Sequence, residues 1–186
     1  MALLINQTFF VGDIQIPNLS NAAELERIIF FISKHEPDCL LKILGYPLYK
    51  LIGVESSQRM TDLFNGAEYI DGIGVERKWK GIKRIENDVP ISLIAYYVYF
   101  KFQESEAVRL SGISNVVGKQ SSSTTVSPAH KMAYAWNLYS EEVSNMISFI
   151  WLKKNQSGER VYPEFGYDQY IETMRISRKI DSIFSF

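Results

Sequence analysis

The residue types that most often carry catalysis are sparse in this sequence, which has only two histidines, His35 and His130, and one cysteine, Cys39. The histidines are far apart along the chain, so a catalytic triad or a histidine base would need a proximity that no spacing indicates. His35 and Cys39 are four residues apart, which on an unbroken helix offers half of a metal site, but Pro37 lies between them. We therefore expect no metal site and interpret Cys39 as a buried thiol.

Two short glycine motifs fall short of nucleotide-binding loops. The GIG stretch at 72–74 is too short for a dinucleotide fingerprint, and GKQ at 118–120 lacks the upstream glycine and the following Ser or Thr of a phosphate loop. Glu141 and Glu142 are adjacent, so on a helix they point about 100° apart and cannot act as an acid and base pair. The sequence predicts neither enzyme activity nor a cofactor, and a hydrolase remains a hypothesis only through a site assembled in three dimensions.

One basic cluster could contact phosphates. Five cations surround Trp79 within residues 76–84 (ERKWKGIKR). They are Arg77, Lys78, Lys80, Lys83 and Arg84. Such a patch can bind nucleic acid while the aromatic ring packs below it. The interpretation that we favour is a surface turn, which Trp79 anchors and the lysines keep soluble.

Composition indicates one compact domain without a membrane segment. The chain has 186 residues, 46% of them hydrophobic, and a formal charge of −1 that does not indicate a nucleic-acid binder. Its single cysteine excludes an intrachain disulfide. The apolar run 91–100 is about half the length that crosses a bilayer, and residues 1–11 do not resemble a signal peptide. We expect a protein that stays in the cytoplasm.

Helical spacing dominates the chain and predicts a mainly α fold. A capping box precedes a helix at 22–34, Pro37 is expected to start a second, short helix, and Pro47 opens a third piece at 48–52. Ser57 caps a further helix that ends near Phe64. Residues 67–81 alternate loosely and contain glycines, which predicts a small hairpin or an irregular loop.

Two long helices are the best-defined elements of a predicted helical bundle. The first is expected to start at Asp88 and Pro90 and to run from 91 to about 108, apolar nearly all round. The second, 128 to about 154, carries a stripe with Trp136 and Tyr139 that we interpret as core or subunit contact. The Gly- and Ser-rich segment 111–125 between them is expected to protrude as a loop or small hairpin.

Both ends of the chain are predicted to be extended arms. Residues 3–16 mix β-formers with Gly12, which predicts a short strand or extended arm that turns near that glycine and lies against the body. The tail contains Pro163 and Gly166 and ends in phenylalanine, and we expect it to need a partner surface. The predicted organisation is a helical domain at 1–160 followed by a docking arm at 161–186.

The order of these features resembles the head-to-tail connector family of tailed phages, also called head-completion or portal-adaptor proteins, in a branch found in phages of gut Bacteroidetes. The resemblance covers roughly residues 3–151 and lies in pattern and order. Its segments are HEPDCLLKILGYPLYKLI, WKGIKRI, PISLIAYYVYFKFQ, the Gly/Ser loop and SPAHKMAYAWNLYSEEVSNMI.

The resemblance implies a structural protein of the virion neck, present in the host cytoplasm during assembly. It implies a ring, commonly of twelve copies, that joins the portal protein to tail or stopper proteins, with double-stranded DNA passing through without sequence-specific contact. A head-to-tail ring requires two different complementary patches on each copy. The alternatives are another neck subunit, such as a stopper or tail-completion protein, and a DNA-binding packaging factor.

The resemblance also implies where contacts are made. The loop would face the channel or a neighbouring subunit, and the tail would reach the portal or an adjacent subunit. The loop residues expected to make contacts are Gly112, Val116, Val117 and Lys119. Those of the tail are Tyr162, Phe165, Tyr167, Tyr170, Phe184 and Phe186.

Overall fold

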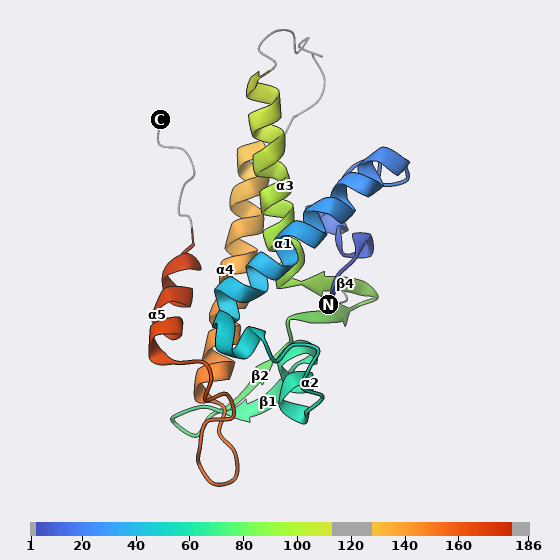
Figure 1. Cartoon of the computed structure of the whole chain (residues 1–186). Coiled ribbons are helices and arrows are strands. Elements are labelled where there is room, and N and C mark those ends of the chain that lie inside the picture. Colours follow the sequence, from blue (N-terminus) through green and yellow to red (C-terminus); the bar gives the residue numbers. More distant parts are fainter. Residues whose placement is uncertain (1–2, 113–127, 180–186) are drawn as a thin grey trace.

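The computed structural model describes residues 3–112 and 128–179, and it shows the mainly helical fold that the sequence predicts (Figure 1). The helices are α1 (Ala22–Tyr49), α2 (Gln58–Asn65), α3 (Leu93–Gly112), α4 (Pro128–Leu152) and α5 (Tyr167–Ile176). The strands form two antiparallel hairpins, β1 (Ala67–Ile70) with β2 (Glu76–Trp79) and β3 (Lys83–Glu86) with β4 (Val89–Ser92). Within these ranges, no helix is both long and apolar enough to cross a membrane.

The core forms where α3 and α4 run side by side in opposite directions and α1 crosses them (Figure 1). The first two turns of α3, from Leu93 to Tyr99, are buried on almost every side, as their continuous apolar sequence predicts. α4 contributes an inward stripe at Val143, Met146 and Ile150. α5 packs against α1 and α4 and closes this side of the core.

Helix α1 is longer than the sequence suggests. It begins at the predicted cap, where the Asn21 side chain accepts a hydrogen bond from the Ala23 amide, but it continues through Pro37 instead of restarting there. Proline removes one intrahelical hydrogen bond. The fully buried neighbours Cys39 and Leu40 supply packing that offsets this loss. The helical path breaks only at Gly45, whose φ of 70° suits glycine. The last turn ends at Tyr49, so only the first two residues of the piece expected at 48–52 are helical.

The first long helix starts at Leu93, two residues later than predicted, because the residues expected to mark its start belong to a hairpin. Asp88 and Pro90 belong to the β3–β4 hairpin, which the sequence did not reveal. Asn87 and Asp88 both have positive φ (50° and 62°), as a two-residue type I′ turn requires. Ser92 then caps α3, because its hydroxyl accepts a hydrogen bond from the Ile94 amide. The predicted β1–β2 hairpin and the helix capped by Ser57 are confirmed.

The N-terminal segment does not form the predicted strand. It folds into two 3₁₀ turns, Gln7–Phe9 and Gly12–Ile14, the second of which begins at the predicted glycine. The segment lies against the body as expected, with Ile5 and Phe10 buried. The Glu36 carboxylate, itself fully buried, fixes its beginning by accepting hydrogen bonds from the amides of Leu4 (2.8 Å) and Ile5 (3.0 Å).

Candidate functional site

The basic cluster is built around a buried tryptophan, as predicted. Trp79 ends β2 and is only 2% exposed. Its ring stacks on Phe149 of α4 at 5.9 Å between centroids, and its indole nitrogen donates a hydrogen bond to the Leu63 carbonyl (2.9 Å). The prediction that Trp79 anchors this stretch is therefore confirmed, but the stretch is the strand β2, a link at 80–82 and the start of β3 instead of a surface turn.

Arg84 of the same cluster is a structural residue. Its guanidinium donates to Glu142 of α4 (2.7 Å) and to Glu86 (2.9 Å), and its side chain is 11% exposed. Burial alone would lower the pKa of Arg84, but the hydrogen bond and charge of Glu142 outweigh it and raise that pKa. This cation joins β3 to α4 and is not directed at a partner's phosphate.

The other cations of the cluster differ in whether they have a carboxylate partner. Arg77 pairs with Asp71 (2.9 Å), whose side chain is only 7% exposed, and Lys80 pairs with Glu86 (3.0 Å) at the surface. An exposed ion pair such as that of Lys80 contributes little to stability. Of the five cations in the cluster, Lys78 and Lys83 have no carboxylate within ion-pair distance among the described residues.

The predicted contact residues of the loop are mostly outside the described residues. Val116, Val117 and Lys119 lie in the stretch 113–127, of which the structure gives no account. Gly112 is the last residue of α3, so the helix extends beyond the predicted end near Val108. Residues 111 and 112, which were predicted to belong to the loop, are therefore helical.

Two predicted contact residues of the tail belong to the core. Tyr162 and Phe165 are fully buried, so they cannot contact a partner while the chain keeps this fold. The Tyr162 hydroxyl donates to the Arg59 carbonyl, and its ring packs 5.6 Å from that of Phe149. The tail was predicted to leave the body from residue 161, and at these positions it does not, because its apolar residues complete the core beside α2 and α4.

The following helix, α5, is docked on its own chain. Thr173 is fully buried and donates to the Ile43 carbonyl of α1 (3.2 Å). Tyr170 packs on Trp151 of α4 at 4.8 Å between ring centroids, whereas Tyr167 is 64% exposed and can meet a partner. The last predicted contacts, Phe184 and Phe186, lie outside the described residues.

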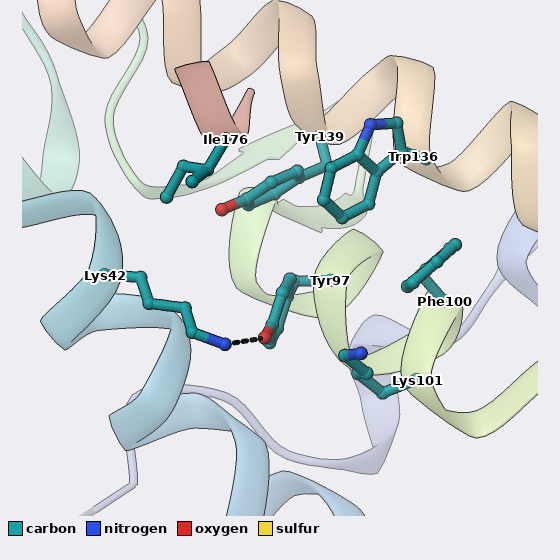
Figure 2. Close-up of a pocket in the computed structure, with 7 residues that line it drawn as sticks. All are labelled: Lys42, Tyr97, Phe100, Lys101, Trp136, Tyr139 and Ile176. Atoms are coloured by element: carbon teal, nitrogen blue, oxygen red, sulfur yellow. Dashed lines mark hydrogen bonds between the residues drawn. The ribbon is translucent and has the colours of Figure 1, made fainter. Parts of the chain in front are cut away.

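A pocket that the sequence did not reveal opens between α1, α3, α4 and the end of α5 (Figure 2). Its volume is about 360 Å³, in the range of small-ligand sites. It is lined by Lys42, Tyr97, Phe100, Lys101, Trp136, Tyr139 and Ile176. We call it the aromatic pocket. Four elements distant in sequence supply these residues, so no single motif could have predicted it.

The walls of the aromatic pocket are a continuous series of rings. Tyr97 lies 5.3 Å from Tyr139 between centroids, Tyr139 lies 5.2 Å from Trp136, and Trp136 lies 4.9 Å from Phe100. All three pairs are tilted, a favourable arrangement of aromatic quadrupoles. The Trp136 indole nitrogen donates to the Arg178 carbonyl (2.8 Å), which fixes the ring. The Trp136 and Tyr139 stripe, interpreted as core or subunit contact, thus borders a rigid opening.

Polar groups at one edge of the pocket form a closed triangle. The Lys42 ammonium donates to Asp38 (2.8 Å) and to the Tyr97 hydroxyl (3.0 Å), and that hydroxyl donates to Asp38 (2.6 Å). Burial raises the pKa of Tyr97 to about 12. The hydrogen bond to Asp38 outweighs burial and raises the pKa of Lys42, while Lys42 and Tyr97 lower that of Asp38 against the effect of burial. None of the three groups exchanges a proton near neutral pH, so the triangle holds the Lys42 ammonium and the Asp38 carboxylate in place at this edge.

Comparisons with known proteins give no relative for this chain: no protein-family model, curated protein or solved structure matches it. Among residues 3–112 and 128–179, no three His, Cys, Asp or Glu side chains gather as a metal site would require. Cys39 is fully buried, and burial raises the pKa of its thiol far above the ordinary value.

Proposed function

We propose that this chain is a structural subunit of a phage neck, which forms a ring that joins the portal to the tail and surrounds the DNA channel. The observation that carries the proposal is the placement of large apolar side chains at separate projecting sites. Phe30 on α1 is 59% exposed, Ile73 in the β1–β2 turn 83%, and Val108 near the end of α3 68%. Exposed apolar groups at several projections are typical of a subunit that is covered on assembly.

The resemblance to connector proteins supplies the type of assembly, a ring docked under the portal. In such a ring each copy meets two neighbours through different surfaces, and exposed apolar sites on different sides of one copy suit that requirement. Twelve copies is the number that the family resemblance implies. The same features suit a stopper or tail-completion subunit. Cross-links to tail proteins, with none to the portal, would identify such a subunit.

The charge distribution supports a surface that DNA passes without being held. The chain carries 20 basic and 21 acidic residues, and three cations of its basic cluster already have carboxylate partners. Many unpaired cations would bind phosphates tightly and with a steep salt dependence. A packaging factor that binds DNA would rely on Lys78 and Lys83, so replacing both by glutamate tests that alternative through duplex binding at low salt.

The proposed function is tested by mixing the purified chain with the portal protein of the phage that would carry it. Native mass spectrometry and negative-stain images are expected to show closed rings of the 21.4 kDa chain stacked on the portal. A chain that stays monomeric at all concentrations and never binds the portal contradicts the proposal. Cross-linking mass spectrometry of the same mixture separates an adaptor, which contacts the portal, from a stopper.

A further inference from the structure

The N-terminal half of α1 projects from the body and carries an unusual group of exposed residues (Figure 1). Phe30 and Ile29 are 59% and 44% exposed, and Glu26 is exposed one helical turn before Phe30. The Phe30 ring meets the edge of its neighbour Phe31 at 6.1 Å between centroids. We call Glu26, Ile29 and Phe30 the α1 knob. It offers an aromatic ring, an aliphatic side chain and a negative charge on one helix end.

Figure 1 shows α5 and the projecting N-terminal half of α1 on opposite sides of the body, and the aromatic pocket is bordered by α5. Ile176, the last residue of α5, borders it. Two ammonium groups lie along the edge opposite Trp136, as Figure 2 shows for Lys42 and Lys101. The Lys101 ammonium lies 5.4 Å from the Phe100 ring centroid and pairs with the exposed Glu104 (2.8 Å). The pocket thus combines aromatic walls with two ammonium groups, each of which has one carboxylate partner and can donate to a second, because an ammonium has three N–H donors.

The chemistry of the α1 knob and that of the aromatic pocket are complementary. A phenyl ring that enters between Tyr97, Trp136 and Phe100 gains tilted contacts of the kind these rings already make with one another. A volume of about 360 Å³ accommodates a side chain smaller than a drug-sized ligand. The Glu26 carboxylate, one turn from Phe30, would then approach the ammonium groups, where opposite charges favour correct pairing over wrong partners.

We propose that the α1 knob of one copy inserts into the aromatic pocket of the next copy. The inference rests on the proposed ring and names the contact that closes it. The knob and the pocket are different surfaces on different sides of the subunit, so the contact is head-to-tail and each copy uses both surfaces once. Repetition of this contact by a fixed rotation closes a ring, and Phe30 is its central anchor.

Single substitutions test each half of the contact by the chain concentration at which half of the protein is assembled. Phe30→Ala and Lys101→Glu are each expected to raise this concentration about tenfold or more, since a central aromatic anchor and a paired charge dominate such contacts. Glu26→Lys is expected to act in the same direction. Combining Glu26→Lys with Lys101→Glu restores assembly, because the reversed charges again attract.

A mixture of two variants tests whether the knob of one copy meets the pocket of another. Phe30→Ala has a damaged knob and an intact pocket, whereas Lys101→Glu has an intact knob and a damaged pocket. Mixed together, they are expected to form a dimer through the one intact contact, while each variant alone forms none at that concentration. A self-complementary contact would also regain one intact contact in the mixed dimer, so the wild type decides the geometry. A head-to-tail contact continues to assemblies larger than a dimer, whereas a self-complementary contact stops at two copies.

Controls keep folding and assembly apart. Circular dichroism and thermal unfolding establish that each variant is folded, and Lys50→Ala, which truncates an exposed polar residue at the end of α1, is expected to leave assembly unchanged. A photoreactive benzoyl group on the Phe30 ring is expected to cross-link to a peptide of another copy that contains Trp136 and Tyr139.

The outcomes separate this inference from the proposed function. Rings that form equally well with Phe30→Ala and Lys101→Glu, with no cross-link to the pocket, overturn the knob contact and leave the ring in place. A wild-type chain that is monomeric alone and with the portal overturns the ring and the inference together. Loss of assembly in both variants, rescue by charge reversal and dimers from the mixture would support it.

Discussion

Glu36 gives the sharpest test of how this chain holds its N-terminal segment. Its fully buried carboxylate accepts hydrogen bonds from the amides of Leu4 and Ile5, which lie more than 30 residues earlier in the chain. Glu36→Ala leaves both donors without a partner. A hydrogen bond to a charged group contributes about 1.5–3 kcal/mol, and an unsatisfied buried donor costs about 1–3 kcal/mol. The Leu4 amide is only partly buried, so water replaces part of its loss.

We therefore expect Glu36→Ala to lower the free energy of unfolding by about 2–4 kcal/mol at pH 7. Glu36→Gln keeps one acceptor oxygen but turns an NH₂ group toward the second amide, so it should lose about half as much. Urea denaturation followed by circular dichroism measures the free energy, and hydrogen exchange of the Ile5 amide measures the local loss. The matched control is Glu26→Gln, an exposed residue on the same helix, which should change stability by less than about 0.5 kcal/mol.

The pH dependence of this contribution has a definite sign. Burial raises the pKa of Glu36 above its ordinary value of 4.5, and the two backbone hydrogen bonds only partly oppose that shift. Between 4.5 and the raised pKa the folded state binds more protons than the unfolded state, so the unfolding free energy of the wild type falls as pH rises through this window. The Gln variant lacks this titration, so the wild type's advantage over it is largest in acid.

The reasoning fails on two measurements. If Glu36→Ala unfolds within about 0.5 kcal/mol of the wild type and the Ile5 amide keeps its protection, the carboxylate does not hold the segment. If the wild type and Glu36→Gln show the same dependence of stability on pH, the raised pKa has no effect on folding.

Three further predictions concern the rest of the core. Gly66→Ala should destabilise the chain by more than about 1 kcal/mol in urea titrations, because the φ of Gly66 is +94° and a Cβ would lie 2.5 Å from a backbone oxygen. Gly158→Ala is the control and should cost less, because Gly158 also has a positive φ but has open space around it. Arg84→Met should lower the unfolding free energy by about 2–4 kcal/mol by leaving Glu142 unpaired, while the double variant with Glu142→Leu should lose less. Cys39 should react with a thiol reagent at pH 8 only as fast as the protein unfolds, because its buried thiol has a raised pKa.

Several elements could be predicted because their signals are local. The helix capped by Ser57 ends at Gly66, and α4 begins at Pro128, each at a residue whose own backbone preference marks a boundary. The alternating residues and glycines of 67–81 predict a small hairpin or an irregular loop, and the structure has the hairpin. Trp79 is predicted to anchor the stretch because it is the one aromatic side chain among five cations, and it is buried.

Other boundaries depended on contacts that the sequence does not display. Pro37 and Pro90 both signal a helix start, yet one lies inside α1 and the other in β4. The first is tolerated because buried neighbours hold the helix on either side, and the second because Asn87 and Asp88 form a turn that pairs two short strands. Local propensity is worth about 1 kcal/mol or less per residue for most types, so packing of this kind overrides it.

The chain alone determined that its chemistry is sparse, since two distant histidines and one cysteine are facts of composition. Only the tertiary structure decided which aromatic residues are core and which are surface: Tyr162 and Phe165 are buried, whereas Phe30 is exposed. The aromatic pocket likewise exists only where four distant elements meet. Exposure and concavity are properties of the packed surface, and residues of the same type lie on either side of it according to contacts far away in sequence.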